Sequence, residues 1–498
     1  MGFFGKKAPL PPPRNPTDTV IPIPAWDDQH HLRALCLHLA YRFDDVLDPE
    51  VPRQSLERLL ELDGWRTLGA RLRKKDDGKL EYHIPAQYNA KRPGFNYTVI
   101  KHPMGIKEHP LAASFPQATG QPSLLGDPAD LTSVCLSADT PTRVDDWLYS
   151  DRPQLVIDVV LFSDATLLTV TFMHTLMDAM GLSSFLKAWT AIMNGRDQVP
   201  TFQQVGEDPA ARFTDRTPAD TYVNGSFLLT GVRFLGFIAC YLFELIWHRG
   251  QNKRIICIPG RYIDEMREQA LHELAEQKLA EQNKEGPAPF LSESDVLLAW
   301  WLKALVRALN PSPGRLVSLW NVFDIRSTAL QESPSENTAF ITNAILVAMT
   351  FLRTHQILRE PVSFVASHIR RSLVQQRTLP QIEAFFALRK SASQKHLPVF
   401  GEPTSLLVCC SNWHRGRFFE VDFSPAVLAP PPHDRVHPLG RPSCVIPLHH
   451  SSGLALRNLG PIIGKDAAGN WWLSCTVRTS AWSGIEQELN ALGARKTQ

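Results

Sequence analysis

The sequence has few cysteines, and those it has are scattered. None of the eight shows the Cys-x-x-Cys spacing of a zinc site, and their positions do not suggest a disulfide framework. The N-terminus lacks the apolar core of a secretion signal, so reduced, buried thiols are expected. The sequence therefore predicts a cytoplasmic protein, with peripheral association with an endomembrane as the one alternative.

An excess of charge of either sign is also lacking. The 52 Lys and Arg residues nearly balance the 50 Asp and Glu residues, which leaves a formal net charge of +2. Nucleic-acid binding requires a concentrated basic surface that neutralises phosphates. The only basic runs are short, so no nucleic-acid partner is expected.

Long apolar runs are lacking with one exception, residues 227–247. Arg233 and Glu244 interrupt this run, and basic residues follow it at His248 and Arg249. Its length is near that of a membrane-spanning helix, and its flanks are typical of a helix on a membrane surface. Three interpretations stay open: a buried crossover segment, a peripheral membrane contact and a membrane span.

The length of 498 residues exceeds what one hydrophobic core organises, so two domains are expected. No internal repeat is evident. The predicted division has a proline-rich lead-in at 1–20, an N-terminal domain at 21–225, a crossover at 226–290 and a C-terminal domain at 291–498. The crossover holds the apolar run and a charged helix that ends at Gly286 and Pro287. A monomer is expected.

Hydrophobic periodicity predicts the main elements. Helices are expected at 55–62, 182–193, 262–285, 294–309 (capped near Ser294), 362–377, 380–389 and 485–492. Strands are expected at 80–84, 155–162, 166–173, 315–322, 344–351, 405–410, 418–423 and 471–477.

The most informative motif is His174-Thr-Leu-Met-Asp178-Ala-Met-Gly181. It follows an apolar strand and precedes an amphipathic helix, so His174 lies at a corner where a rigid scaffold can present it to a cavity. Because histidine titrates near neutrality, His174 is a candidate general base. The alternative is a hydrogen-bonded histidine of the core.

A second cluster follows another apolar strand. It comprises Ser411-Asn412-Trp413, with Asp422 nine residues further on. The indole of Trp413 is a hydrogen-bond donor only, and a buried site has to use it. A core tryptophan beside a turn is the alternative.

Together these motifs resemble those of the BAHD family, the plant and fungal acyl-CoA-dependent acyltransferases. Four stations match in order: 69–73 with the turn at Gly78, 174–181, 321–326, and 411–413 with Asp422 and Phe423. Two departures are Ala179, where the family has glycine, and Ser424-Pro425-Ala426, where it has Gly-Trp-Gly. We interpret these departures as signs of a fungal branch that acts in secondary metabolism.

The resemblance implies an α/β (α+β) fold. Two chloramphenicol-acetyltransferase-like domains, each a mixed β-sheet with flanking helices, would enclose an active-site channel at their interface. It also implies transfer of an acyl group, acetyl by expectation, from acyl-CoA to a hydroxyl of a terpenoid, polyketide or alkaloid. Acyl-CoA would be a co-substrate, and no resident cofactor is expected.

The resemblance implies a role for each site residue. His174 would be the general base of a direct transfer in a ternary complex, and Trp413, with Ser411 as a weaker candidate, would stabilise the oxyanion. Asp178 would pair with Arg326, and Gly181 and Asp422 would be structural. The resemblance identifies no residue that binds the co-substrate.

Four alternatives stay open. The acyl donor could be a carrier protein, although Met173 stands where such enzymes have a second histidine. The chain could be a catalytically degenerate binding protein. Cys409 or Cys410 could form a covalent intermediate. His449 and His450 could suggest a metal pair, but neighbours on a strand diverge and no further ligand is near, so no metal is expected.

Overall fold

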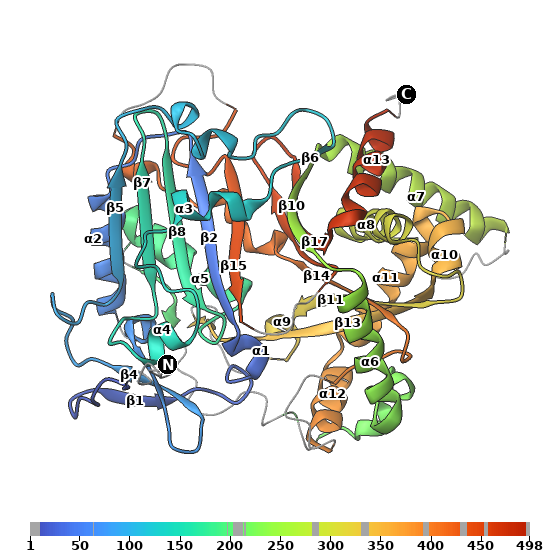
Figure 1. The fold of residues 1–498 in the computed structure, drawn as a ribbon, viewed down its shortest axis with the longest axis horizontal. Coiled ribbons are helices and arrows are strands. Elements are labelled where there is room, and N and C mark those ends of the chain that lie inside the picture. The colour runs from blue at the N-terminus through green and yellow to red at the C-terminus, as the bar shows by residue number, and fades with distance from the viewer. Residues whose placement is uncertain are drawn as a thin grey trace, which may run out of the picture.

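The computed structural model describes residues 10–62, 64–196, 198–202, 213, 216–280, 288–329, 338–391, 398–428, 436–452 and 457–494. Two open β-sheets organise the molecule, and helices cover them (Figure 1). Both sheets contain parallel and antiparallel neighbours. The fold is therefore a mixed α/β architecture, as the sequence predicted.

The first sheet has the strand order β15-β2-β8-β7-β5. Its strands are β2 Leu35–Phe43, β5 Asn96–Lys101, β7 Val156–Leu161, β8 Thr166–Met173 and β15 Cys444–Ser451. The second sheet has the order β13-β11-β14-β16-β17-β10-β6. Its strands are β6 Ser123–Leu124, β10 Gln251–Ile258, β11 Leu316–Asp324, β13 Ile345–Arg353, β14 Leu406–Asn412, β16 Leu459–Lys465 and β17 Trp471–Arg478.

Two small sheets complete the strands. They contain β1 Thr19–Pro22, β3 Arg71–Lys74 and β4 Leu80–Ile84 in one, and β9 Thr201–Phe202 and β12 Thr338–Ala339 in the other. The helices are α1 His30–Arg33, α2 Glu50–Glu61, α3 Thr132–Cys135, α4 Asp145–Leu148, α5 Ala179–Met193, α6 Gly231–Trp247, α7 Gly260–Ala280, α8 Glu293–Leu309, α9 Arg326–Ala329, α10 Thr354–Arg359, α11 Val362–Gln376, α12 Leu379–Ser391 and α13 Trp482–Gly493.

Each sheet has its own group of helices. Helices α2 and α5 pack against each other beside the first sheet, and the core there includes Phe43, Phe185 and Trp189. Helix α8 is the central helix of the second group and contacts α7, α10, α11 and α13. The cap of α8 is Ser292, whose hydroxyl accepts from the backbone N–H of Asp295, and not Ser294 as the sequence suggested.

The chain exchanges strands between the two sheets. Strand β15 comes from the C-terminal part of the chain and pairs with β2 in the first sheet. Strand β6 comes from the N-terminal part and pairs with β10 in the second sheet. The predicted division of the chain at 226–290 stays a prediction. Each of these two strands pairs in the sheet that is formed mainly by the chain segment on the other side of that division.

The sequence interpretation was wrong at 418–423. These residues form the 3-10 turn Phe418–Glu420, with a second turn at Ser424–Ala426, instead of a strand. Arg417 starts the change of direction with a left-handed φ of 52°. Phe418 and Phe419 are both buried, which adjacent residues of a strand with one solvated face would not be.

Strands β10, β15 and β16 were not predicted, although each pairs over most of its length. The charged helix α7 was predicted, but its predicted end at Gly286 and Pro287 lies outside the described residues. In the part of the chain that the structure describes, no helix is long and apolar enough to cross a membrane. Residues 227–247, for which a membrane span was one interpretation, hold the 17-residue helix α6.

Candidate active site

His174 lies directly after β8, at the corner where the first sheet passes into α5. Its backbone N–H donates to the carbonyl of Leu35 (3.0 Å), which extends the ladder between β8 and β2. Its own carbonyl accepts from the side-chain amide of Asn343 (2.9 Å). The backbone of the histidine is therefore held from both sides.

The imidazole of His174 is half-buried. Burial lowers the pKa of His174 below its ordinary value of 6.5, while its own carbonyl, Asp178 and Asn343 act in the opposite direction. Nδ1 is buried and has no hydrogen-bond partner within the described part of the chain. Nε2 is not one of the buried polar atoms that lack a partner. A neutral imidazole can accept a proton.

Asp178 is the N-cap of α5, and its carboxylate is fully engaged. Oδ1 accepts from the backbone N–H of Gly181 (2.8 Å), and Oδ2 accepts from that of Ala344 (2.8 Å). The guanidinium of Arg326 donates to both oxygens, at 2.9 and 3.1 Å. With these four bonds the carboxylate orients the corner, and no described bond links it to the imidazole.

Arg326 joins the two sheets at this corner. Besides Asp178, it donates to Asp324 (2.6 Å), to the carbonyl of Phe340 (3.1 Å) and to that of Thr342 (2.6 Å). Burial lowers the pKa of Arg326, but the charges of Asp178 and Asp324 outweigh this effect and hold it above the ordinary value. The cation therefore stays charged although it is nearly enclosed.

Gly181 lies inside the first turn of α5, since the helix begins at Ala179 and not after the glycine as the sequence suggested. A Cβ at this position would lie 2.0 Å from the carbonyl oxygen of Ile341. The absence of a side chain thus lets the segment 340–344 approach the helix. This close contact explains why the glycine stands here although Ala179 is tolerated.

Two residues of the corner could not be identified as site residues from the sequence. Asp27 is buried and accepts from both the backbone N–H (2.8 Å) and the side-chain amide (2.6 Å) of Asn343. Asn343 in turn holds the carbonyl of His174. Both residues lie outside the predicted elements and outside any recognisable motif.

Trp413 follows β14, and its indole N–H donates to the hydroxyl oxygen of Ser411 (2.9 Å). The backbone N–H of Trp413 donates to the carbonyl of Ile462 (2.8 Å). The turn after it reaches the helix that starts at the His174 corner, because the hydroxyl of Ser183 donates to the carbonyl of Gly416 (2.8 Å). The structure thus brings the second motif to the side of α5.

Asp422 lies at the other end of α5. Its carbonyl accepts from the side chain of Asn194, the C-cap of α5, and its carboxylate accepts from the N–H of Ser424. The helix of 15 residues separates it from Asp178 by about 22 Å along the axis. The next residue, Phe423, packs its ring against Trp189 and Phe43. The structure therefore does not bring Asp422 together with His174.

The two adjacent cysteines are poor nucleophiles. Burial raises the pKa of Cys409 to about 12 and raises that of Cys410 well above its ordinary value. Since the thiolate is the reactive form, neither residue is poised for a covalent intermediate.

His449 and His450 diverge, as expected for neighbours on a strand. The Nδ1 of His449 lies 2.8 Å from the ammonium of Lys253, whereas the Nδ1 of His450 lies 2.9 Å from the ring of His38. Among the described residues, no group of three or more His, Cys, Asp or Glu side chains could hold a metal ion.

A cavity of about 550 Å³ opens beside the second motif. Its walls include His414, next to Trp413, and Phe418, whose ring packs edge-on against that of Trp413. Three cations line it, Arg417, Arg441 and Lys465. No sequence motif indicates these cations, because they are separated in sequence and belong to different turns and strands.

Solved structures share this architecture. A crystal structure of Fusarium TRI101 complexed with coenzyme A and T-2 (F. sporotrichioides) superposes with a TM-score of 0.62 over 94% of this chain and 97% of that chain. The sequence identity is 14%, so this likeness concerns the fold. The class defined by the fold is thus that of two-sheet α/β proteins with this strand order and helix cover.

Sequence comparison gives the family. Residues 249–427 match the Transferase family. The acetyltransferase adrJ of Penicillium rubens is 41% identical over 99% of this chain and 100% of its own length. The acetyltransferase sphE of Aspergillus fumigatus is 40% identical over 98% of each chain. Other relatives are named O-acyltransferases, and two are named transcriptional regulators. The chain belongs to the Transferase family, the BAHD-type acyltransferases, and it is an enzyme of that kind.

Proposed function

We propose that the protein transfers an acyl group, acetyl by preference, from acyl-CoA to a hydroxyl of a fungal secondary metabolite. The observation that carries the proposal is the corner at His174, where the backbone of the histidine is fixed by hydrogen bonds and burial lowers the pKa of its imidazole. The names of the relatives and the coenzyme A bound in TRI101 support the donor and the reaction class.

In this mechanism Nε2 of His174 accepts the proton of the acceptor hydroxyl as its oxygen attacks the thioester carbonyl. The carbonyl oxygen gains negative charge in the tetrahedral intermediate. When that intermediate collapses, the C–S bond breaks, and the imidazolium returns the proton to the leaving thiolate. The transfer is direct, which agrees with the high pKa of Cys409.

Ser411 and Trp413 would stabilise the oxyanion together. Because the indole N–H is already donated to the oxygen of Ser411, the hydroxyl of Ser411 keeps its own proton free to donate to an oxyanion. Trp413 then positions Ser411. Loss of one such donor typically costs about 2.7–4 kcal/mol of transition-state stabilisation.

The cavity beside Trp413 would hold the charged part of the donor. Arg417, Arg441 and Lys465 lie on its wall together with Glu420 and Asp466. Arg417 pairs with Glu420 at 3.5 Å, and Lys465 pairs with Glu293 at 2.5 Å. The carboxylate of Asp466 accepts from Asn470 and Trp472. Cations of this kind recognise phosphate groups. This assignment extends the site beyond the residues found from sequence.

His174→Ala tests the proposal, with His355→Ala on the exposed α10 as the matched control. Thiol release from acetyl-CoA is measured with water and with a panel of hydroxylated terpenoids and polyketides, and CoA binding is measured by calorimetry. We expect His174→Ala to lose turnover at least a thousandfold while it still binds CoA. Undiminished turnover would refute the assignment of the base, and turnover only with an acyl-carrier protein would refute that of the donor.

A further inference from the structure

Helix α6 presents an apolar face to solvent along its whole length. The exposed fractions are 85% for Val232, 65% for Leu235, 42% for Leu242, 60% for Phe243, 63% for Ile246 and 71% for Trp247. At 100° per residue, these positions fall within one arc of the helix, so they lie on one side of it. The rings of Phe243 and Trp247 stack with centroids 5.6 Å apart. We call these six residues the α6 face.

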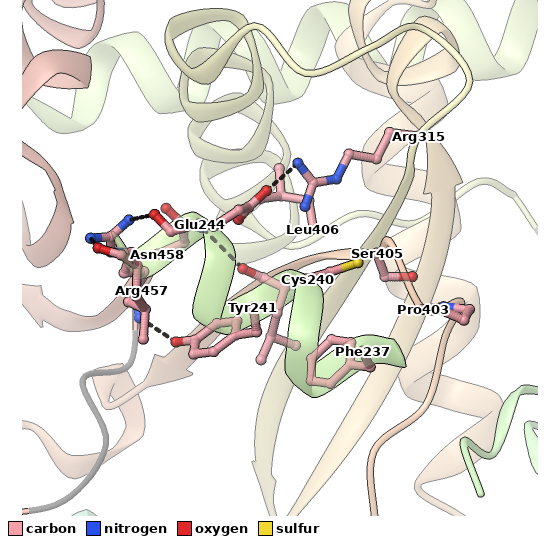
Figure 2. A pocket seen from close by; sticks show the side chains of 12 residues that line it. Phe237, Cys240, Tyr241, Glu244, Arg315, Pro403, Ser405, Leu406, Arg457 and Asn458 are labelled. Carbon is pink, nitrogen blue, oxygen red and sulfur yellow. Dashed lines mark hydrogen bonds and ion pairs between the residues drawn. The ribbon is translucent and has the colours of Figure 1, made fainter. Parts of the chain in front are cut away.

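The other side of α6 carries the polar contacts, as Figure 2 shows. Glu244 forms an ion pair with Arg315 at 2.5 Å. Arg457 donates to the carbonyl of Glu244 (2.9 Å) and to that of His248 at the C-terminal end of the helix. Phe237 is buried against this side.

The helix is therefore inverted relative to an ordinary surface helix. Its one carboxylate faces the protein, and its large apolar side chains face outward. The ion pair and the Arg457 contacts oppose rotation of α6, so the exposed face is built into the fold. The space behind the helix amounts to only about 10 Å³, too little for an organic ligand, so α6 is not covering a binding pocket.

An arginine lies at each end of the α6 face. Arg233 near its start and Arg249 just after its end are both exposed. Glu244 is neutralised by Arg315 on the inner side. An apolar face with Trp, Phe and Leu bordered by arginines is complementary to a membrane surface with anionic headgroups.

The dimensions agree with a helix that lies in a membrane surface. Seventeen residues extend about 25 Å, and the arginines stand at the two ends, where headgroups flank a helix that lies flat. We propose that the protein docks through the α6 face onto membranes that contain anionic lipids. This inference is independent of the proposed reaction.

Vesicle flotation of the full chain tests the proposal. Vesicles of phosphatidylcholine alone are compared with vesicles that contain about one third phosphatidylserine. The double variant Phe243→Gln/Trp247→Gln removes apolar contact, and Leu279→Gln/Val374→Gln is the matched control, because Leu279 and Val374 are also exposed apolar residues but lie on α7 and α11.

We expect the protein to bind the anionic vesicles, the α6 double variant to bind more than tenfold less, and the control to bind as the unchanged protein does. Arg233→Gln/Arg249→Gln should lower binding to anionic vesicles and reduce its salt dependence. Equal loss in the control, or no binding of the unchanged protein to either vesicle, would overturn the proposal. So would a dimer in solution that the α6 double variant dissociates, since a second copy would then cover the face.

Discussion

At the scale of single residues, the protonation state of His174 decides what the corner can do. Burial lowers the pKa of the imidazole, and Asp178 only partly offsets this effect. The neutral form is therefore the major form at pH 7 and remains so below pH 6.5. A base that is already deprotonated can act without a preceding proton loss.

The first prediction concerns pH. Because the neutral imidazole is the active form and its pKa is lowered, kcat/KM should stay constant through neutral pH and fall only as the pH drops below 6.5. The measurement is kcat/KM for acetyl-CoA against pH at a fixed concentration of acceptor. A midpoint above pH 6.5 would contradict the assignment of His174 as the base in this environment.

The second prediction concerns Gly181. Gly181→Ala places a methyl group 2.0 Å from the carbonyl oxygen of Ile341, and the backbone has to shift to relieve the clash. We expect a loss of about 1–3 kcal/mol in the free energy of unfolding, measured in urea. Gly126→Ala is the matched control, since a Cβ there meets nothing within 4 Å. Equal stability of the two variants would refute the close-approach argument.

At the scale of elements, α5 connects the site to the rest of the fold. Its N-cap Asp178 holds Arg326 at the end of β11 and Ala344 before β13, so one carboxylate joins the first sheet to the second. Farther along α5, Ser183 holds the turn after Trp413. A displacement of this helix would therefore change both motifs together.

The third prediction follows from this connection. Among the described residues, Asp178→Ala leaves the nearly enclosed Arg326 with Asp324 as its one carboxylate partner, and it removes acceptors for two backbone N–H groups. We expect a loss of about 3–5 kcal/mol in the free energy of unfolding. Glu50→Ala, which breaks an exposed ion pair with Arg53, should cause no measurable change. Parallel losses in the two variants would contradict the structural role of the pair.

At this scale the sequence predicted the elements with strong periodicity. The hairpin β7–β8 and the helices α5, α8 and α11 agree with the expected ranges within a few residues. Strand β15 was not predicted, because Pro447 interrupts its sequence pattern. Proline is nevertheless tolerated there, because β15 is an edge strand and an edge strand can lack an N–H donor. Asp27 and Asn343 were not predicted as site residues, because they reach the His174 corner only when the chain is folded.

At the scale of the whole molecule, the strand exchange makes the two sheets depend on each other. The first sheet needs β15 as its edge strand, and the second sheet includes β6. The pair of Asp178 and Arg326 adds a polar connection. We therefore expect the two halves of the chain to depend on each other in folding.

The fourth prediction follows. A fragment that contains only residues 21–225 should lack fixed tertiary structure, because β2 has no partner on its outer side and Asp178 has no cation. Near-UV circular dichroism and thermal unfolding of the fragment measure this. Co-expression with residues 226–498 should restore structure. A cooperative thermal transition of the isolated fragment would contradict the dependence.

The fifth prediction concerns the contact between β10 and β15. Burial lowers the pKa of Lys253 from 10.5 to about 8, so the unfolded chain holds a proton between these values that the folded protein lacks. Burial of the charged ammonium lowers the free energy of unfolding by its full amount below pH 8, and this destabilisation disappears as the pH rises to 10.5. Relative to Lys253→Met, the unchanged protein should thus gain stability between pH 8 and 10. A constant difference in the free energy of unfolding across that range would contradict this.

The position of β15 near the C-terminal end of the chain also affects folding during translation. After His174 emerges from the ribosome, about 280 more residues must be added before Ser451 emerges. At ordinary elongation rates this takes roughly 15–55 s. Throughout that time the edge of β2 that pairs with β15 would leave its backbone groups unpaired. We therefore expect this edge of β2 to need shielding until translation is nearly complete.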